Sequence, residues 1–282
     1  MTRASRFGLR ILTLLFGLVL GTSPVCANEQ KIQQRALLQQ KALATKGDAA
    51  AQTQLGLIYA NGKGTTVNPL EAIKWFRLAA AQNYAEAQFQ LGIMYAFGHG
   101  LKQDDQAAVD WYQRAAAQAH ARAQNELGLM HDRGRGVRRD DAEAVKWYRL
   151  AAEQGDATAQ VNLGIKYDLG HGVRQSYREA VKWFRAAADQ GNASALNNLG
   201  VMYADGLGVT VSRIVAHALY HLSATVDPSA ANQAGNNRNA IARKMTASEI
   251  DAAQALAREL SASKTLLKTL DVWCAGRAIK LL

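Results

Sequence analysis

Two histidines four residues apart, His217 and His221, are the first residues of this chain that suggest chemistry. On one face of a helix, this spacing lets two imidazoles share a metal ion. No third ligand is evident, however, and the two histidines occupy positions of a repeat that should point in different directions. The sequence therefore predicts neither a metal site nor a cofactor.

Two further patterns match fragments of known motifs. Ser261-Ala-Ser-Lys264 has the Ser-x-x-Lys spacing of penicillin-recognising enzymes, but the companion motifs are missing. Gly62-x-Gly64 resembles part of a phosphate-binding loop, yet no strand precedes it, so we interpret it as a turn. No serine, histidine and carboxylate lie at a spacing that suggests a shared pocket. We therefore predict a chain that is not an enzyme and has no catalytic residues.

The histidines and the glycine turn belong to repeats. The pattern Leu-Gly-x-x-Tyr-x-x-Gly-x-Gly recurs every 36 residues, starting at Leu55, Leu91, Leu127, Leu163 and Leu199. In the third copy His131 replaces the tyrosine. A fixed period in this range is typical of a solenoid of stacked units, whose usual product is an extended binding surface. We therefore expect a binding partner and not a substrate.

Each repeat is predicted to form two helices. In the unit 157–192, the recurring residues lie three and four positions apart up to a turn containing Gly170 and Gly172. Ser176 then starts a second helix, with Glu179 placed to complete a capping box. The same capping position holds Asn68, Asp104, Asp140 and Ser212. The composition, with 49% apolar residues and three prolines, also favours an all-helical chain.

Glycine and tryptophan recur at fixed positions of the repeat and are interpreted as packing residues. A glycine within the first helix costs about 1 kcal/mol relative to alanine, so we expect a neighbouring helix to approach it closely. Trp75, Trp111, Trp147 and Trp183 are predicted to fill the space between units. Leu219 replaces this tryptophan in the fifth unit, which therefore resembles a terminal repeat. Tyr84 and His120 stand where other junctions have a capping residue, so these two junctions should be looser.

The domain organisation follows from this register. Five repeats are predicted at 49–84, 85–120, 121–156, 157–192 and 193–228, after an N-terminal capping helix at 28–48. A degenerate C-terminal repeat is expected at 229–262, followed by an amphipathic basic tail at 263–282. The tail either seals the last repeat or contacts a membrane or partner.

Residues 1–27 are predicted to be a signal peptide. Arg3, Arg6 and Arg10 precede an apolar run that ends near Gly21, and small residues around Ala27 fit a cleavage site. We therefore expect a periplasmic or secreted protein with no transmembrane segment in the mature chain. Cleavage lowers the formal charge from +10 to +7, because the segment holds three arginines and no acid. For an exported protein, this basic charge points to an anionic envelope polymer or an acidic protein and not to nucleic acid.

The recurring residues resemble a known family. Ala-x-x-x-Leu-Gly-x-x-Tyr-x-x-Gly-x-Gly, followed by Glu-Ala-x-x-Trp-Tyr/Phe-x-x-Ala-Ala-x-Gln-Gly, is similar to the Sel1-like repeat family, which is related to tetratricopeptide repeats. The resemblance implies an all-α, α/α solenoid, a right-handed superhelix of helix-turn-helix repeats. It also implies an adaptor or scaffold for protein contacts, often exported in bacteria, without catalytic residues.

The partner is predicted to bind positions that have no packing role. With 100° per residue, the second, sixth and thirteenth positions of each repeat lie nearly opposite the recurring residues of the first helix. We predict that partner-binding residues come from this stripe: Glu86, Gln90, Phe97, Arg122, Glu126, Arg133, Asn162, Leu169 and Asn198. A polar stripe with exposed aromatic and arginine side chains suits a protein or peptide partner.

The sequence thus favours an exported scaffold that binds a protein partner. Two alternatives stay open. The first is a binder of anionic cell-envelope glycan or lipid, which the basic charge suggests. The second is a cell-wall or β-lactam hydrolase, which rests on family analogy alone.

Overall fold

The computed structural model describes residues 35, 37–229, 232–263 and 265–278. The predicted signal peptide, residues 1–27, lies outside the described part of the chain. Within that part every regular element is a helix, and no described helix is long and apolar enough to cross a membrane. A helical segment at 37–45 is followed by α2 (Ala49–Asn61), α3 (Pro69–Ala81), α4 (Ala85–Phe97), α5 (Asp105–Ala116), α6 (Ala121–Arg133), α7 (Asp141–Glu153), α8 (Ala157–Leu169), α9 (Tyr177–Asp189), α10 (Ala193–Asp205), α11 (Arg213–Val226), α12 (Ala234–Ala242), α13 (Ala247–Ala262) and α14 (Leu266–Ala278).

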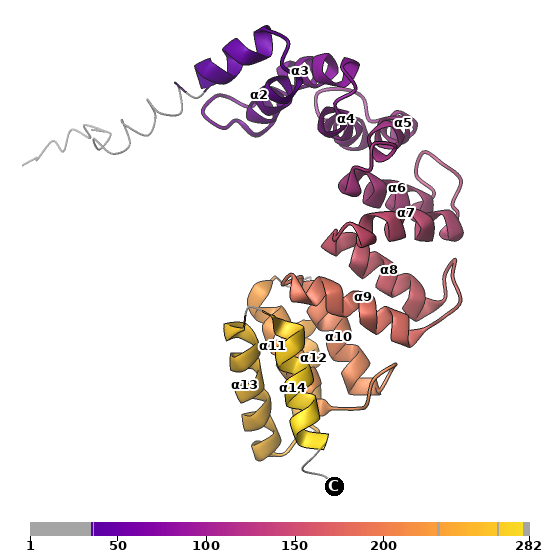
Figure 1. The fold of residues 1–282 in the computed structure, drawn as a ribbon, viewed down its shortest axis with the longest axis vertical. Coiled ribbons are helices and arrows are strands. Elements are labelled where there is room, and N and C mark those ends of the chain that lie inside the picture. The colour runs from indigo at the N-terminus through magenta and orange to yellow at the C-terminus, as the bar shows by residue number, and fades with distance from the viewer. Residues whose placement is uncertain (1–34, 36, 230–231, 264, 279–282) are drawn as a thin grey trace, which may run out of the picture.

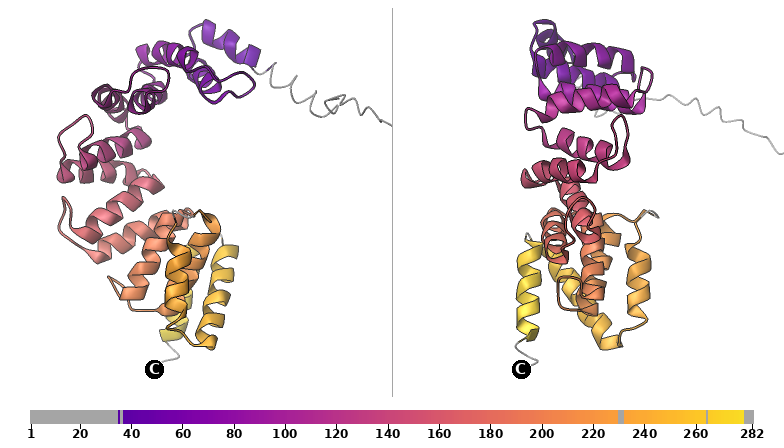
Figure 2. Two further views of the ribbon diagram at one scale, coloured as in Figure 1. Left: turned by 180° about the vertical axis from the view of Figure 1, so that it is seen from behind. Right: turned by 90° about the vertical axis from the view of Figure 1, so that its right-hand side faces the viewer.

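The helices pack in consecutive pairs, from α2 with α3 to α10 with α11, and each pair stacks on the next. Figures 1 and 2 show the pairs following one another along a curved rod, with α2 and α3 near one end and α13 and α14 at the other. Both ends of the rod turn toward the same side, so the rod has a concave side. The predicted solenoid of paired helices is confirmed.

Side-chain caps start the second helix of every repeat. Asn68, Asp104, Asp140, Ser176 and Ser212 each accept a hydrogen bond from a backbone amide in the first turn, as predicted.

The expected reciprocal bond of Glu179 is not formed. Its carboxylate instead lies 3.6 Å from the Lys182 ammonium, since a lysine three residues on can attract it. A complete capping box occurs at Thr246 and Glu249, at the start of α13.

The junction before α6 differs from expectation. Tyr84 makes no capping bond, as predicted, but the Nδ1 atom of His120 accepts a hydrogen bond from the Ala123 amide at 3.2 Å. The prediction of an uncapped helix at His120 was therefore wrong, because an unprotonated imidazole nitrogen can replace the carboxylate or amide oxygen of the other junctions.

Aromatic rings explain the glycines of the first helices. A Cβ atom at Gly164 would lie 2.6 Å from the Phe184 ring, and the same contact recurs in all five repeats. The ring belongs to the residue after the recurring tryptophan, on the second helix of the same repeat. The tryptophans lie between repeats, as predicted: Trp111 of α5 packs against a cluster of buried residues from α3 and α4.

The C-terminal helices cover the fifth repeat. Leu219 of α11 is fully buried, because α11 contacts α12 and α13 as well as α10. The fifth repeat is therefore internal and not the end of the rod.

The helix α14 of the tail packs against α9 and α13. There the Arg185 guanidinium donates to both carboxylate oxygens of Asp271, at 2.6 and 2.7 Å. Leu270 of α14 also belongs to the cluster of buried residues that includes Leu199 and Leu219, so this part of the tail contacts both the fourth and the fifth repeat.

Candidate partner-binding surface

The predicted stripe follows the first helices α4, α6, α8 and α10. None of its nine residues is buried, and the side chains at the helix ends are the most open. Phe97 and Leu169 are 60% and 53% exposed, and neither belongs to a cluster of buried residues. These positions thus have little role in the packing of the rod.

Two hydrogen bonds and one cation–π contact hold three of the predicted residues at the junction between repeats 2 and 3. The Glu86 carboxylate accepts from Gln90 at 2.7 Å and lies 2.9 Å from the Nε2 atom of His120. Because Nδ1 of His120 accepts the capping bond, Nε2 carries a proton and donates to Glu86. Arg122 lies over the Phe89 ring, 4.6 Å from its centroid. These contacts hold Glu86, Gln90 and Arg122 in place before any partner binds.

The pKa values of two carboxylates in this region, Glu86 and Glu126, are shifted in opposite directions. The hydrogen bond from His120 lowers the pKa of Glu86, against the opposing effect of its burial. Burial raises the pKa of Glu126, and the hydrogen bond from Asn125 and the charges of Arg122 and Arg133 only partly offset it. The surroundings of Glu86 therefore favour its charged form, whereas burial disfavours the charged form of Glu126.

The remaining predicted residues are more separate. The Asn162 amide donates to Asn125 at 3.0 Å and so joins α8 to α6. Asn198 lies half-exposed on α10, and Arg133 is exposed at the end of α6. The structure thus brings Glu86, Gln90, Arg122 and Glu126 together and leaves the others spread along the rod.

The sequence reasoning missed an aliphatic row beside this stripe. The ninth position of each repeat holds Leu57, Ile93, Leu129, Ile165 and Val201, and all five are at least partly exposed. Their signal was in the sequence, since they lie three residues after the sixth position and so on the same helix face. Apolar and polar side chains therefore run side by side along the first helices.

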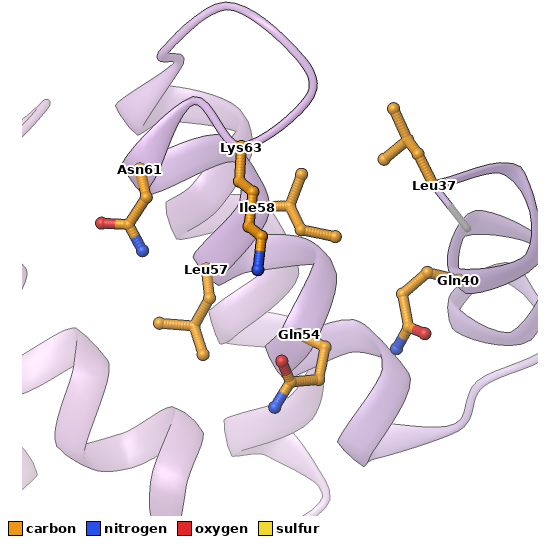
Figure 3. Close-up of a pocket in the computed structure, with 7 residues that line it drawn as sticks. All are labelled: Leu37, Gln40, Gln54, Leu57, Ile58, Asn61 and Lys63. Atoms are coloured by element: carbon orange, nitrogen blue, oxygen red, sulfur yellow. The ribbon is translucent and has the colours of Figure 1, made fainter. Parts of the chain in front are cut away.

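Two grooves open on this face near the N-terminal end. One, of about 420 Å³, lies between the helical segment 37–45 and α2 (Figure 3). The other, of about 400 Å³, lies between α2 and α4 and includes Gln90 and Ile93. Leu57 and Asn61 line both grooves, so the two are adjacent.

The residues considered for chemistry lie elsewhere. His217 is 5% exposed and its burial lowers its pKa, whereas His221 is half-exposed beside Arg238. Gly62 and Gly64 adopt positive φ angles of 68° and 76° in a turn between helices, as expected. Lys264 of the Ser-x-x-Lys pattern lies outside the described residues. Among the described residues, no three His, Cys, Asp or Glu side chains are placed to hold a metal ion.

Comparison with known proteins agrees with this geometry. The Sel1 repeat model matches five segments of the chain, at 49–84, 85–120, 121–156, 157–192 and 193–225. A search of curated proteins finds no match.

Two solved structures are similar over most of the chain. A Sel1 repeat protein from Oxalobacter formigenes is 34% identical, with a TM-score of 0.63, over 71% of this chain and 82% of that one. A protective antigen present in uropathogenic Escherichia coli strains, which displays an SLR fold, is 36% identical with a TM-score of 0.64. That match covers 83% of this chain but 54% of the antigen, so the chain spans about half of the antigen's length. The resemblance seen in the sequence is confirmed: this chain belongs to the Sel1 repeat family.

Proposed function

We propose that this chain is an exported scaffold that binds a protein partner along the first helices of its repeats. Sel1 repeat solenoids generally serve as scaffolds for protein–protein interaction. The arginine-led apolar segment at residues 1–27 supports export. The similarity to a protective antigen also fits a protein outside the cytoplasm.

One observation carries the proposal: a partly exposed face of mixed apolar and polar side chains runs along α2, α4, α6, α8 and α10. It combines exposed Phe97 and Leu169 with the aliphatic row and with polar groups that neighbouring side chains already hold in place. Exposed apolar groups flanked by ordered polar groups are typical of binding surfaces. An elongated surface of this kind suits a protein or peptide partner.

Site-specific photo-crosslinking tests this surface. A benzophenone amino acid replaces Phe97 or Leu169, and in matched controls it replaces Leu78 or Leu150 of the second helices, which are 45% and 44% exposed. Irradiation of intact cells should give a discrete protein adduct at the first two positions only. Equal adducts at all four positions, or none at Phe97 and Leu169, would contradict the proposal.

Charge reversal tests the arginines of the same face. We expect Arg122→Glu with Arg133→Glu to weaken capture of the crosslinked partner by at least about tenfold, because interface arginines often carry a large share of the binding energy. The control is Lys74→Glu with Lys146→Glu, which reverses two exposed lysines on α3 and α7. Equal loss in both variants would indicate a nonspecific charge effect.

A second candidate function is binding of an anionic cell-envelope glycan or lipid. Lys102, Arg138 and Arg174 occupy the same position in three consecutive repeats, are exposed, and form no ion pair with any described residue. Retention on an immobilised anionic polymer should then fall with added salt and be lost when all three residues become glutamate. Retention that is unaffected by salt and by the three substitutions would exclude this candidate function.

A further inference from the structure

The groove at the N-terminal end of the rod has an unusual combination of side chains. Its lining consists of aliphatic groups, carboxamides and a single ammonium group, without a carboxylate: Leu37, Gln40, Gln54, Leu57, Ile58, Asn61 and Lys63. In Figure 3, Gln40 approaches from the segment 37–45, whereas Gln54, Ile58 and Lys63 approach from α2 and its C-terminal turn. A volume of about 420 Å³ accommodates one or two amino-acid residues of a ligand.

The polar groups of this groove are available to a ligand. The side chains of Gln54, Asn61 and Lys63 form no hydrogen bond or ion pair with any described residue. Gln40 donates one amide proton to the Ala51 carbonyl at 3.4 Å and keeps the other. The groove therefore offers several donors and one uncompensated positive charge beside an apolar wall. This chemistry complements an apolar group that carries a carboxylate.

The adjacent groove indicates what kind of molecule carries that carboxylate. It continues from Leu57 and Asn61 across α2 to Gln90 and Ile93 of α4. A small free carboxylate would fill the first groove only. An extended peptide advances about 3.3 Å per residue, so a few residues reach from the first groove into the second. The continuity of the two grooves thus favours a peptide over a small acid.

We propose that the groove binds the C-terminal residue of a partner polypeptide. Lys63 and the carboxamides bind its terminal carboxylate, and Leu37 and Leu57 contact its apolar side chain. The preceding residues run over α2 toward α4. This inference rests on the proposed function and adds to it an orientation, with the end of the partner chain at the first repeat.

Peptide binding to the purified chain tests the assignment. The probes are fluorescent eight-residue peptides ending in Leu, Ile, Val, Met or Phe, each made with a free carboxylate and with a C-terminal amide. We expect the wild-type chain to bind the best free acid about tenfold more tightly than its amide, the effect of one exposed ion pair with one charge-assisted hydrogen bond. Lys63→Met should abolish this preference and Lys63→Arg should keep it. Lys74→Met, at an exposed lysine of α3, is the matched control and should leave it unchanged.

Three outcomes would overturn the assignment: binding of no peptide, equal binding of acids and amides, or a preference that survives in Lys63→Met. Hexanoate serves as a further probe, and its binding in a Lys63-dependent manner without peptide binding would assign the groove to small carboxylates. These failures differ from failure of the proposed function. If photo-crosslinking at Phe97 succeeds while the acid preference is absent, the scaffold stands and only the orientation of its partner is wrong.

Discussion

Two neighbouring junctions of the rod place different side chains at equivalent positions. Between repeats 2 and 3, Met130 of α6 belongs to the same buried cluster as Ala96 of α4. Between repeats 3 and 4, the equivalent positions hold Lys166 and Asp132, and the ammonium of Lys166 lies 2.5 Å from the Asp132 carboxylate. Lys166 also binds Asp141 at 2.8 Å, while its side chain is only 5% exposed. One repeat geometry thus accommodates either an apolar pair or a buried ion cluster at these positions.

The comparison separates the contacts that both junctions share from those that differ. Both junctions keep the second glycine of the loop, Gly136 or Gly172, where a Cβ atom would overlap the backbone carbonyl of Asp105 or Asp141. The loop of each repeat therefore lies directly on the first turn of the second helix before it. The backbone contact is common to both junctions, and the side chains around it differ.

The largest expected effect comes from this shared contact. Gly172→Ala should lower the free energy of unfolding by about 3 kcal/mol, because the position has a positive φ of 73° and the new methyl group would collide with Asp141. Gly191→Ala is the matched control, since φ is 77° there but the space around it is open, and about 1 kcal/mol is expected. Urea denaturation measures both. Equal losses would show that the loop contact adds nothing to the backbone strain.

The second prediction addresses the ion cluster itself. Lys166→Met should lower the free energy of unfolding by about 2 kcal/mol, because Asp132 and Asp141 lose their shared cation while staying about 70% buried. The double variant Lys166→Met with Asp132→Ala copies the Met130 and Ala96 pair, and Asp141 keeps Arg139 at 3.2 Å.

We expect the double variant to recover at least half of this loss in urea denaturation. If it is less stable than the single variant, the two junctions are not interchangeable and the comparison fails. A single variant as stable as the wild type would show instead that the ion cluster contributes nothing.

The sequence predicted the shared features of these junctions better than their differences. Helix pairing, the capping residues and the turn glycines recur every 36 residues, so periodicity alone revealed them. The ion cluster was not predicted, because Asp132, Asp141 and Lys166 come together only when repeats stack. His120 was missed as a cap for a different reason, since histidine is not among the preferred capping residues.

The binding stripe, too, was predicted only in part. Its exposure was predictable from helical periodicity. The prediction assigned too few positions of the helix to the exposed face, however, and so left out Ile93 and the rest of the aliphatic row. The groove between the segment 37–45 and α2 depends on how that segment packs, which no repeat position encodes. Local geometry and the tryptophans between repeats were thus predictable, whereas the polar contacts between repeats were not.

The third prediction uses pH to separate two carboxylates of the same repeat. The hydrogen bond from Lys166 lowers the pKa of Asp141, so its stabilising contribution is present above the unfolded pKa of about 3.9 and is lost as the pH falls through its folded value. Burial raises the pKa of Glu126, so its contribution has the opposite sign: folding favours the protonated form, and stability decreases as the pH rises through the region around its unfolded pKa of about 4.3 and above.

Urea denaturation between pH 3 and pH 7 can measure this difference. Asp141→Asn should be less stable than the wild type at pH 7, with the gap closing toward pH 3. Glu126→Gln should gain stability relative to the wild type as the pH rises from 4 to 7. Parallel curves for the two variants would show that burial does not set the Glu126 charge.

The smallest expected effect tests a contact outside the repeats. Asp271→Asn removes the carboxylate that holds α14 on Arg185 of α9, but the Asp271 side chain is 61% exposed, so we expect a loss of only about 0.5 kcal/mol. Because α14 adds few contacts to the rod, the loss should appear as faster hydrogen exchange in α14 while α9 keeps its protection. Equal acceleration of exchange in both helices would mean that α14 unfolds together with the repeats and not separately from them.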